Sequence, residues 1–253
     1  MDFYEGDFTN AVDAIESGGT EEIESLIDES GVLNSTEETV MEKVEQLIDK
    51  AQWENFWYEA SGTWTTQFTS LFNGSKTIKI LPKLNFKNAT VISGLCANSS
   101  LERVEYFINS SNATNLRVVF NACKSLVYIY GIDASKATNL EHAFSRNDLL
   151  ETIQEPLNFS SATKVSDCFT NCTALKNIRF VPESIKISII IPSSVLSAES
   201  IQSIIDGLAL VTTAQTLTLH ANAKILQSQV DSANAKGWTV AGGMVVSEEE
   251  YYA

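Results

Sequence analysis

Apolar positions recur along residues 65–187 with a period of 24 or 25 residues. Each repeat starts at a threonine, and the set is Thr66, Thr90, Thr114, Thr138 and Thr163. A bulky or sulfur-containing side chain stands six positions after each threonine: Phe72, Cys96, Phe120, Phe144 and Phe169. Two aliphatic columns follow, spaced as L-x-x-I: Ile78, Leu101, Leu126, Leu150 and Leu175, then Leu81, Val104, Ile129, Ile153 and Ile178. A fixed period in the twenties is typical of repeats that share one continuous core.

Within one repeat, the pattern predicts a short helical turn followed by a short strand. Threonine is a favourable helix N-cap, and the apolar residues two and six positions after it would share one helical face. The L-x-x-I segment follows a small polar corner and indicates a strand. The expected fold class is α/β, a leucine-rich-repeat solenoid with short parallel strands stacked on one face. The expected strands are Ile80–Pro82, Arg103–Tyr106, Tyr128–Tyr130, Thr152–Gln154 and Asn177–Phe180.

The pattern divides the chain into three parts, residues 1–62, 63–187 and 188–253, with about five repeats in the middle part. The first part is acidic and is expected to be helical, with a capping box at Ser35–Glu38 that starts an amphipathic helix. The aromatic cluster within Trp53–Trp64 would cover the first repeat. The alternative interpretation of this cluster is a platform on which sugars stack.

The period fails after Phe180, so residues 188–253 are expected to form a C-terminal cap and tail. The tail from Ser247 is charged and is expected to fray. The other elements expected here are strands at Ile185–Ile191, Thr216–Leu219 and Trp238–Val240, and helices at Ala198–Leu208 and Ala221–Ala235.

The charge of the chain resides in its N-terminal part. Residues 1–60 hold 17 Asp/Glu and 2 Lys/Arg, and 2 − 17 = −15 equals the net charge of the whole chain. Neither part carries the basic patch that binds nucleic acid, and the acidic segment disfavours docking on anionic lipid. We expect no nucleic-acid partner, and the acidic segment could instead dock on a larger assembly.

Targeting signals are not visible in this sequence. No apolar run approaches the ~18–20 residues that a membrane-spanning helix needs. The first residues, Met1–Asp7, lack the basic region and apolar core of a signal peptide. We expect a chain made without such a leader, a chain that has lost it, or a chain exported by another route.

The four cysteines are expected to be buried free thiols. Cys123 and Cys172 share one column but lie two repeats apart, which is about 10 Å at a strand spacing of ~4.8 Å. A disulfide needs a Cα separation below ~7 Å. Cys96 replaces a core phenylalanine and is therefore expected to be buried. Cys168 and Cys172 have no C-x-x-C partner set and no nearby histidine, so a zinc site is not expected.

The repeat from Thr114 to Ser135 resembles the BspA-like leucine-rich repeats of bacterial surface proteins. It carries T-N-L-x-x-x-F-x-x-C-x-x-L-x-x-I followed by I-D-x-S, with Phe120, Cys123 and Asp133 in place. The resemblance covers roughly residues 65–187 and is looser at residues 89–112. It implies a right-handed solenoid used for adhesion or recognition at a cell surface. The family also occurs beside phage-tail genes, so a phage particle is the other expected location.

The exposed side of the expected strands is the best candidate for a binding site. Side chains alternate between faces along a strand, so the residues on either side of the Ile column would point away from the core. Tyrosine and arginine, which are enriched at binding hot spots, occupy its centre and flanks. The predicted set is Arg103, Glu105, Tyr128, Tyr130, Thr152, Gln154, Asn177 and Arg179, with Ile80 and Pro82 on the first repeat. The alternative interpretation is a merely solvated face.

The expected function is non-enzymatic recognition or adhesion, through protein or glycan bound on this face. The alternative is a structural spacer or assembly component of a phage tail or surface complex. His142 and His220 are the two histidines, and no catalytic, phosphate-binding or metal-binding pattern surrounds them. We therefore expect no catalytic residue, cofactor or metal, and both histidines are interpreted as surface residues.

Overall fold

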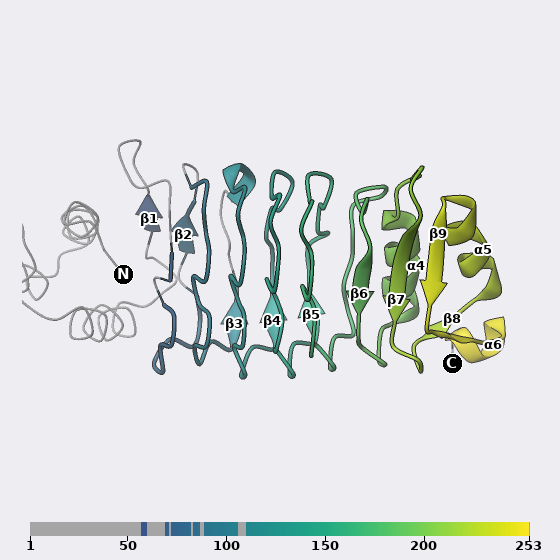
Figure 1. The fold of residues 1–253 in the computed structure, drawn as a ribbon. Helices are drawn as coiled ribbons and strands as arrows, with labels where there is room; N and C mark the ends of the chain where they lie inside the picture. The colour runs from purple at the N-terminus through teal and green to yellow at the C-terminus, as the bar shows by residue number, and fades with distance from the viewer. Residues whose placement is uncertain are drawn as a thin grey trace, which may run out of the picture.

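The computed structural model describes residues 57–59, 69–70, 72–81, 83–86, 89–105 and 110–252. The helices expected in the N-terminal part and most of the aromatic cluster lie outside these residues. The first strand is β1 (Trp57–Glu59), and the strands of the repeat part are β2 (Lys83–Asn85), β3 (Arg103–Val104), β4 (Tyr128–Ile129) and β5 (Thr152–Ile153). Figure 1 shows successive turns of the chain side by side in one row, and below they are called coils.

The strands of the L-x-x-I segments form one parallel ladder. β3, β4 and β5 are neighbours, with Arg103 opposite Tyr128 and Tyr128 opposite Thr152. Single parallel bridges extend the ladder to Ile80 on one side and Asn177 on the other. The parallel strands therefore lie where the L-x-x-I column predicts them, although each regular strand is shorter than expected. β1 and β2 also pair in parallel, although β1 lies in the segment expected to be a helical cap and β2 lies in the repeat part.

The repeating threonine has a different role from the predicted N-cap. The hydroxyl of Thr114 donates a hydrogen bond to the backbone carbonyl of Thr90 (3.1 Å), and Thr138 donates to Thr114 in the same way (3.1 Å). Thr163 continues the series by donating to the carbonyl of Thr138 (3.1 Å). These threonines thus form a ladder that joins one coil to the next, and the prediction that they cap helices is wrong.

The predicted helical turn is instead a run of tight turns, at residues 92–98, 116–122, 140–146 and 165–171. In the first three of these runs every second N–H donates to the next coil, for example Leu116 to Asn139, Val118 to Glu141, Phe120 to Ala143 and Ala122 to Ser145. An α-helix keeps these N–H groups within its own segment. Bonding between coils therefore replaces bonding within a helix.

The backbone of each turn run is left-handed at two positions. One column of positive φ contains Ser70, Gly94, Val118, His142 and Asp167, and the other contains Gly74, Asn98, Ala122, Arg146 and Asn171. Non-glycine residues adopt this region at a cost of ~1–3 kcal/mol, and β-branched ones least readily. Stacking therefore imposes a conformation that the local sequence, particularly at Val118, does not favour.

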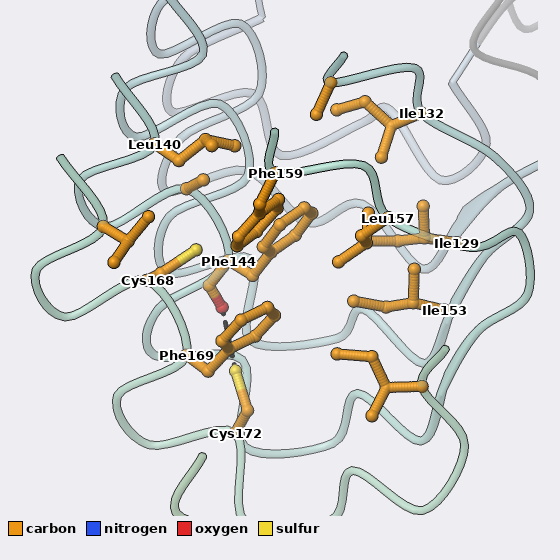
Figure 2. Close-up of a cluster of buried hydrophobic side chains, with 14 of the residues drawn as sticks. Ile129, Ile132, Leu140, Phe144, Ile153, Leu157, Phe159, Cys168, Phe169 and Cys172 are labelled. Carbon is orange, nitrogen blue, oxygen red and sulfur yellow. Dashed lines mark hydrogen bonds between the residues drawn. The ribbon is translucent and has the colours of Figure 1, made fainter. Parts of the chain in front are cut away.

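Stacked phenylalanines form the centre of the core (Figure 2). The Phe144 ring lies 6.3 Å from that of Phe120 and 5.3 Å from that of Phe169, with 7° between the planes of the second pair. Phe159 stacks on Phe169 at 6.4 Å, and Phe180 meets Phe159 edge-on at 5.3 Å. All five rings are buried, so the predicted Phe column is the spine of one continuous hydrophobic core.

The corner after each phenylalanine supplies a side-chain hydrogen bond to the preceding coil. The thiol of Cys123 donates to the carbonyl of Cys96 (2.9 Å), the amide of Asn147 to Phe120 (2.9 Å), and the thiol of Cys172 to Phe144 (3.0 Å; Figure 2). All four cysteines are buried free thiols. Burial raises the pKa of Cys123 to about 11 and that of Cys172 to about 12. Both thiols therefore keep the proton that these bonds need.

Parallel stacking continues in the C-terminal part, now with helices between the strands. β6 (Ile189–Ile191), β7 (Gln215–Leu219) and β9 (Trp238–Ala241) form one parallel sheet, and β8 (Lys224–Ile225) pairs with β10 (Met244–Val245). The helices are α4 (Ala198–Gly207), α5 (Gln227–Ala235) and α6 (Glu248–Tyr252) (Figure 1).

Two predictions for this part are wrong. The helix expected at Ala221–Ala235 begins only at Gln227, because Lys224–Ile225 is strand β8. The tail expected to fray forms helix α6, whose Tyr251 is only 6% exposed. Burial of this one aromatic ring, together with its hydrogen bonds, holds a segment that is otherwise highly charged.

Helix α4 covers the open edge of the repeat sheet. The Ser200 hydroxyl accepts from the N–H of Ile178 (3.0 Å) and donates to the carbonyl of Lys176 (3.0 Å). The Ser203 hydroxyl accepts from the N–H of Phe180 (2.9 Å). Serine side chains of one helix face thus satisfy backbone groups that a further strand would otherwise pair, which protects a sheet edge from unwanted association.

Candidate functional site

The repeat-face strip is the set Arg103, Glu105, Tyr128, Tyr130, Thr152, Gln154, Asn177 and Arg179. Along each rung the strip alternates with a buried aliphatic residue: Val104, Ile129, Ile153 and Ile178 are at most 1% exposed. The strip residues are all partly or fully exposed. The structure therefore brings the eight predicted residues together on one outer face, and Ile80 extends that face by one rung. Pro82 lies outside the described residues.

The centre of the strip is aromatic. Tyr130 is 44% exposed, whereas Tyr128 is half-buried. The guanidinium carbon of Arg103 lies 5.3 Å from the centroid of the Tyr128 ring, a cation–π geometry. Arg103 also lies 3.6 Å from the Glu105 carboxylate. Arg103 therefore screens Tyr128 from solvent, and Tyr130 offers the larger apolar contact surface.

The other end of the strip is held by hydrogen bonds between coils. The Asn177 side-chain amide donates to the Thr152 hydroxyl (3.1 Å). The Arg179 guanidinium donates to the backbone carbonyl of Gln154. These contacts restrain long polar side chains before any ligand arrives, which lowers the entropic cost of binding.

A neighbouring column was missed by the sequence reasoning. The residue after the Leu column faces solvent on every rung, and its members are Lys79, Glu102, Val127, Glu151 and Lys176. Lys79 and Glu102 form an ion pair at 3.0 Å, while Val127 is 38% exposed. The sequence signal for this column was the position directly after the Leu column of L-x-x-I. Val127 is the one apolar residue at that position, and the other four are charged.

Together the two columns form an apolar centre with a charged surround. Val127 and Tyr130 both belong to the middle rung, beside Ile129. The rung before it carries Glu102, Arg103 and Glu105, and the rungs after it carry Glu151, Glu155, Lys176 and Arg179. Hot spots of protein interfaces have this organisation, an aromatic centre within a polar rim.

The two histidines are placed apart from the strip. His142 is half-buried and has a left-handed φ of 55° in a turn run. His220 follows β7 and accepts a hydrogen bond on Nδ1 from the N–H of Asn222 (3.1 Å). In the part of the chain that the structure describes, no group of three or more His, Cys, Asp or Glu residues could hold a metal ion. The same described residues include no helix long and apolar enough to cross a membrane.

Comparison with known proteins identifies no relative: no family model, no curated protein and no solved structure matches the chain. The resemblance of the Thr114–Ser135 repeat to BspA-like repeats therefore stays an expectation from the sequence motif. The function has to be argued from the strip itself.

Proposed function

We propose that this chain is a non-enzymatic recognition module, built as a leucine-rich-repeat solenoid, that binds a protein ligand through the repeat-face strip. The observation that carries the proposal is the exposed apolar pair Val127 and Tyr130, set among charged rungs. Solvation alone would not require an exposed valine and an exposed tyrosine on the same rung of an outer face. Tyrosine provides contact area and a polar tip at low entropic cost.

A protein ligand is favoured over a glycan by the charges around this centre. Lys79, Arg103 and Arg179 alternate with Glu102, Glu105 and Glu151 along the coils. A surface with both signs at fixed spacing selects a partner of complementary pattern. A neutral glycan could stack on Tyr130 and hydrogen-bond its polar neighbours, but it has no fixed charges to match the alternating signs of this pattern.

The setting that we propose is the surface of a bacterial cell or a phage particle. It rests on the resemblance of the Thr114–Ser135 repeat to repeats of bacterial surface proteins. The stacked parallel ladders support the solenoid part of this proposal, because each coil contributes one rung to the same outer face.

The experiment compares binders selected on the parent chain with two variants. A displayed library of protein fragments is panned on the immobilised chain, and the same chain is applied to a glycan array. We expect fragments whose affinity falls by roughly 30-fold or more in Tyr128→Ala/Tyr130→Ala, which corresponds to the ~2 kcal/mol or more typical of a hot spot. The control Leu149→Ala removes an equally exposed apolar side chain outside the strip and should bind normally.

The melting temperature of the double variant should stay near that of the parent, because both tyrosines lie outside the core. Fragments that bind the parent and the double variant equally would show that the strip is not the site. Array signals that depend on Tyr130 but not on Arg103 or Glu105 would replace the protein ligand with a glycan. A much lower melting temperature would mean that the tyrosines are packed.

A further inference from the structure

A cavity of about 370 Å³ lies where α4, α6 and the chain at Phe180–Pro182 meet. Its volume is within the 300–1,000 Å³ typical of ligand pockets. Phe180, Pro182, Tyr251 and Tyr252 supply ring surface, and Glu199 and Asp206 supply carboxylates. No lysine or arginine lines it. The lining therefore combines aromatic surface with negative charge.

The wall of this pocket is held by buried hydrogen bonds. Gln229, which is 4% exposed, donates from Nε2 to the Tyr251 hydroxyl (2.9 Å) and to Oε1 of Gln202 (2.8 Å). The Tyr251 hydroxyl donates in turn to the carbonyl of Ala198 (2.7 Å). Gln202 then donates from Nε2 to Oδ1 of Asp206 (2.9 Å). This chain of bonds docks α6 on α4 and fixes the Asp206 carboxylate at the rim before any ligand binds.

The two carboxylates have no ion-pair partner among the described residues, although one lysine lies near Asp206. Neither Glu199 nor Asp206 forms an ion pair with any residue that the structure describes. Lys236 is near Asp206, but its ammonium donates to the backbone carbonyls of Ile205 (3.0 Å) and Asp206 (3.4 Å). The negative charge of the pocket is therefore not neutralised from within the described chain.

The dipole of α4 accounts for the position of the Glu199 carboxylate but not for that of the Asp206 carboxylate. Glu199 lies in the first turn of α4, where a negative charge is favourable to the helix dipole. Asp206 lies in the last turn, where a negative charge is unfavourable. Tyr252 is 74% exposed, with its ring 5.0 Å from and nearly perpendicular to that of Tyr251. Asp206 accepts the Gln202 hydrogen bond and Tyr252 packs edge-on against Tyr251, and both residues remain exposed at the rim.

We propose that this pocket binds an arginine side chain of a partner protein. A guanidinium is weakly hydrated, stacks on aromatic faces and pairs with carboxylates through a planar set of donors. Tyr252 and Pro182 would contact its plane, and Asp206 and Glu199 would accept its N–H groups. The pocket is formed by other residues than the repeat-face strip, so the two sites can be tested separately.

The test is a titration of the isotope-labelled full chain with acetyl-Gly-Arg-Gly-amide, followed by amide chemical shifts. A salt concentration of about 0.15 M limits screening to ~8 Å and suppresses diffuse attraction to the acidic N-terminal part. We expect saturable shifts at Gln202 and Ser203. The matched peptide with citrulline, a neutral isostere of arginine, should bind about tenfold more weakly, because the charge-assisted and cation–π contacts are lost.

Variants locate the binding within the pocket. Asp206→Asn and Tyr252→Ala should each weaken binding of the arginine peptide by about fivefold to tenfold. Asp167→Asn changes an exposed carboxylate outside the lining and should bind like the parent, as should Tyr130→Ala in the strip. Since Tyr251 and not Tyr252 forms the docking bonds, the melting temperature of Tyr252→Ala should not change.

Three results would overturn the proposal. The first is an absence of shifts at the pocket, and the second is equal binding of the arginine and citrulline peptides. The third is equal binding of acetyl-Gly-Lys-Gly-amide, which would remove the guanidinium assignment. Loss of arginine binding in Tyr130→Ala alone would move the peptide to the strip. None of these results bears on the fragments selected on the strip, so the two proposals can fail independently.

Discussion

The coils within residues 89–180, called repeat coils, and the coils within residues 185–252, called helical coils, both stack in parallel. Different hydrogen bonds hold the two kinds of coil together. In the turn runs at residues 92–98, 116–122 and 140–146, every second N–H donates to the next coil, and threonine hydroxyls join the same coils from another side. Among residues 185–252, α4 and α5 satisfy much of their backbone locally. A repeat coil therefore depends on its neighbours for its conformation, whereas a helical coil brings part of its own stability.

This difference predicts where a defect spreads. In a stack, the stability of one unit includes the interfaces with both neighbours. A cavity in the middle of the repeat part should weaken two interfaces, and a lost contact at the junction with α4 should weaken one. A change that relieves strain in a turn run should have the smallest effect.

The largest expected effect is that of Phe144→Ala. Its ring has aromatic neighbours at 6.3 Å and 5.3 Å on opposite sides, so truncation opens a hole in the stacked column. We expect a loss of ~3–5 kcal/mol in the free energy of unfolding, the usual range for a buried phenylalanine. Chemical denaturation with a constant m-value measures it.

Phe72→Ala is the matched comparison, because Phe72 is buried in the same column near its end. It should destabilise less than Phe144→Ala if coupling between neighbouring coils matters. Equal and small losses at both positions would show that the column is not the core of a coupled stack.

The next effect concerns the junction between the two kinds of coil. Ser200→Ala removes a hydroxyl that serves both the N–H of Ile178 and the carbonyl of Lys176. The carbonyl of Lys176 keeps the N–H of Ser197 as a donor (2.9 Å), whereas the buried N–H of Ile178 loses its acceptor, so we expect a loss of ~1–3 kcal/mol. Ser232→Ala is the control, because its exposed hydroxyl bonds only within α5, to the carbonyl of Ser228.

Hydrogen exchange would show whether this loss is local. The amides of Ile178 and Phe180 should exchange faster in Ser200→Ala, while those of β4 should keep most of their protection. Uniform loss of protection through the repeats would mean that the helical coils and the repeat coils unfold as one unit, which would remove the distinction between them.

Much of the repeat part could be predicted because period and alternation report burial directly. Phe120, Phe144 and Phe169 form the core column, and Tyr128 and Tyr130 flank a buried Ile129, as alternation along a strand requires. The helical turn was wrong because an apolar pair four residues apart fits both a helix and a turn run. One repeat does not reveal whether its N–H groups bond within the segment or to the next coil.

The C-terminal pocket could not be predicted for a different reason. Its lining comes from Phe180, α4 and α6, which are separated in the sequence and meet only after folding. The tail was expected to fray because Glu248–Glu250 dominate its composition. Its order depends on single contacts, namely the capping bond from the N–H of Ser247 to Glu250 (3.1 Å) and the burial of Tyr251.

The smallest expected effect tests the turn run itself. Val118 has a φ of 51°, a conformation that β-branched residues adopt only under constraint. Asparagine tolerates the left-handed region well, and Asn98 and Asn171 already occupy it in the neighbouring column. Val118 is half-buried, so Val118→Asn relieves strain and gives up some apolar contact. We expect the strain to dominate and the free energy of unfolding to rise by roughly 0.5–1 kcal/mol.

The control for Val118→Asn is Val195→Asn, at an exposed valine whose φ is not positive. This surface change should stay within about ±0.5 kcal/mol of the parent. The two variants differ in backbone conformation and in burial, because Val118 is half-buried and Val195 is exposed. A gain for Val118→Asn without a gain for Val195→Asn would show that relief of strain outweighs the lost apolar contact. A loss for Val118→Asn alone would show that this apolar contact outweighs the strain that stacking imposes on residue 118, and the contrast between the two kinds of coil would weaken.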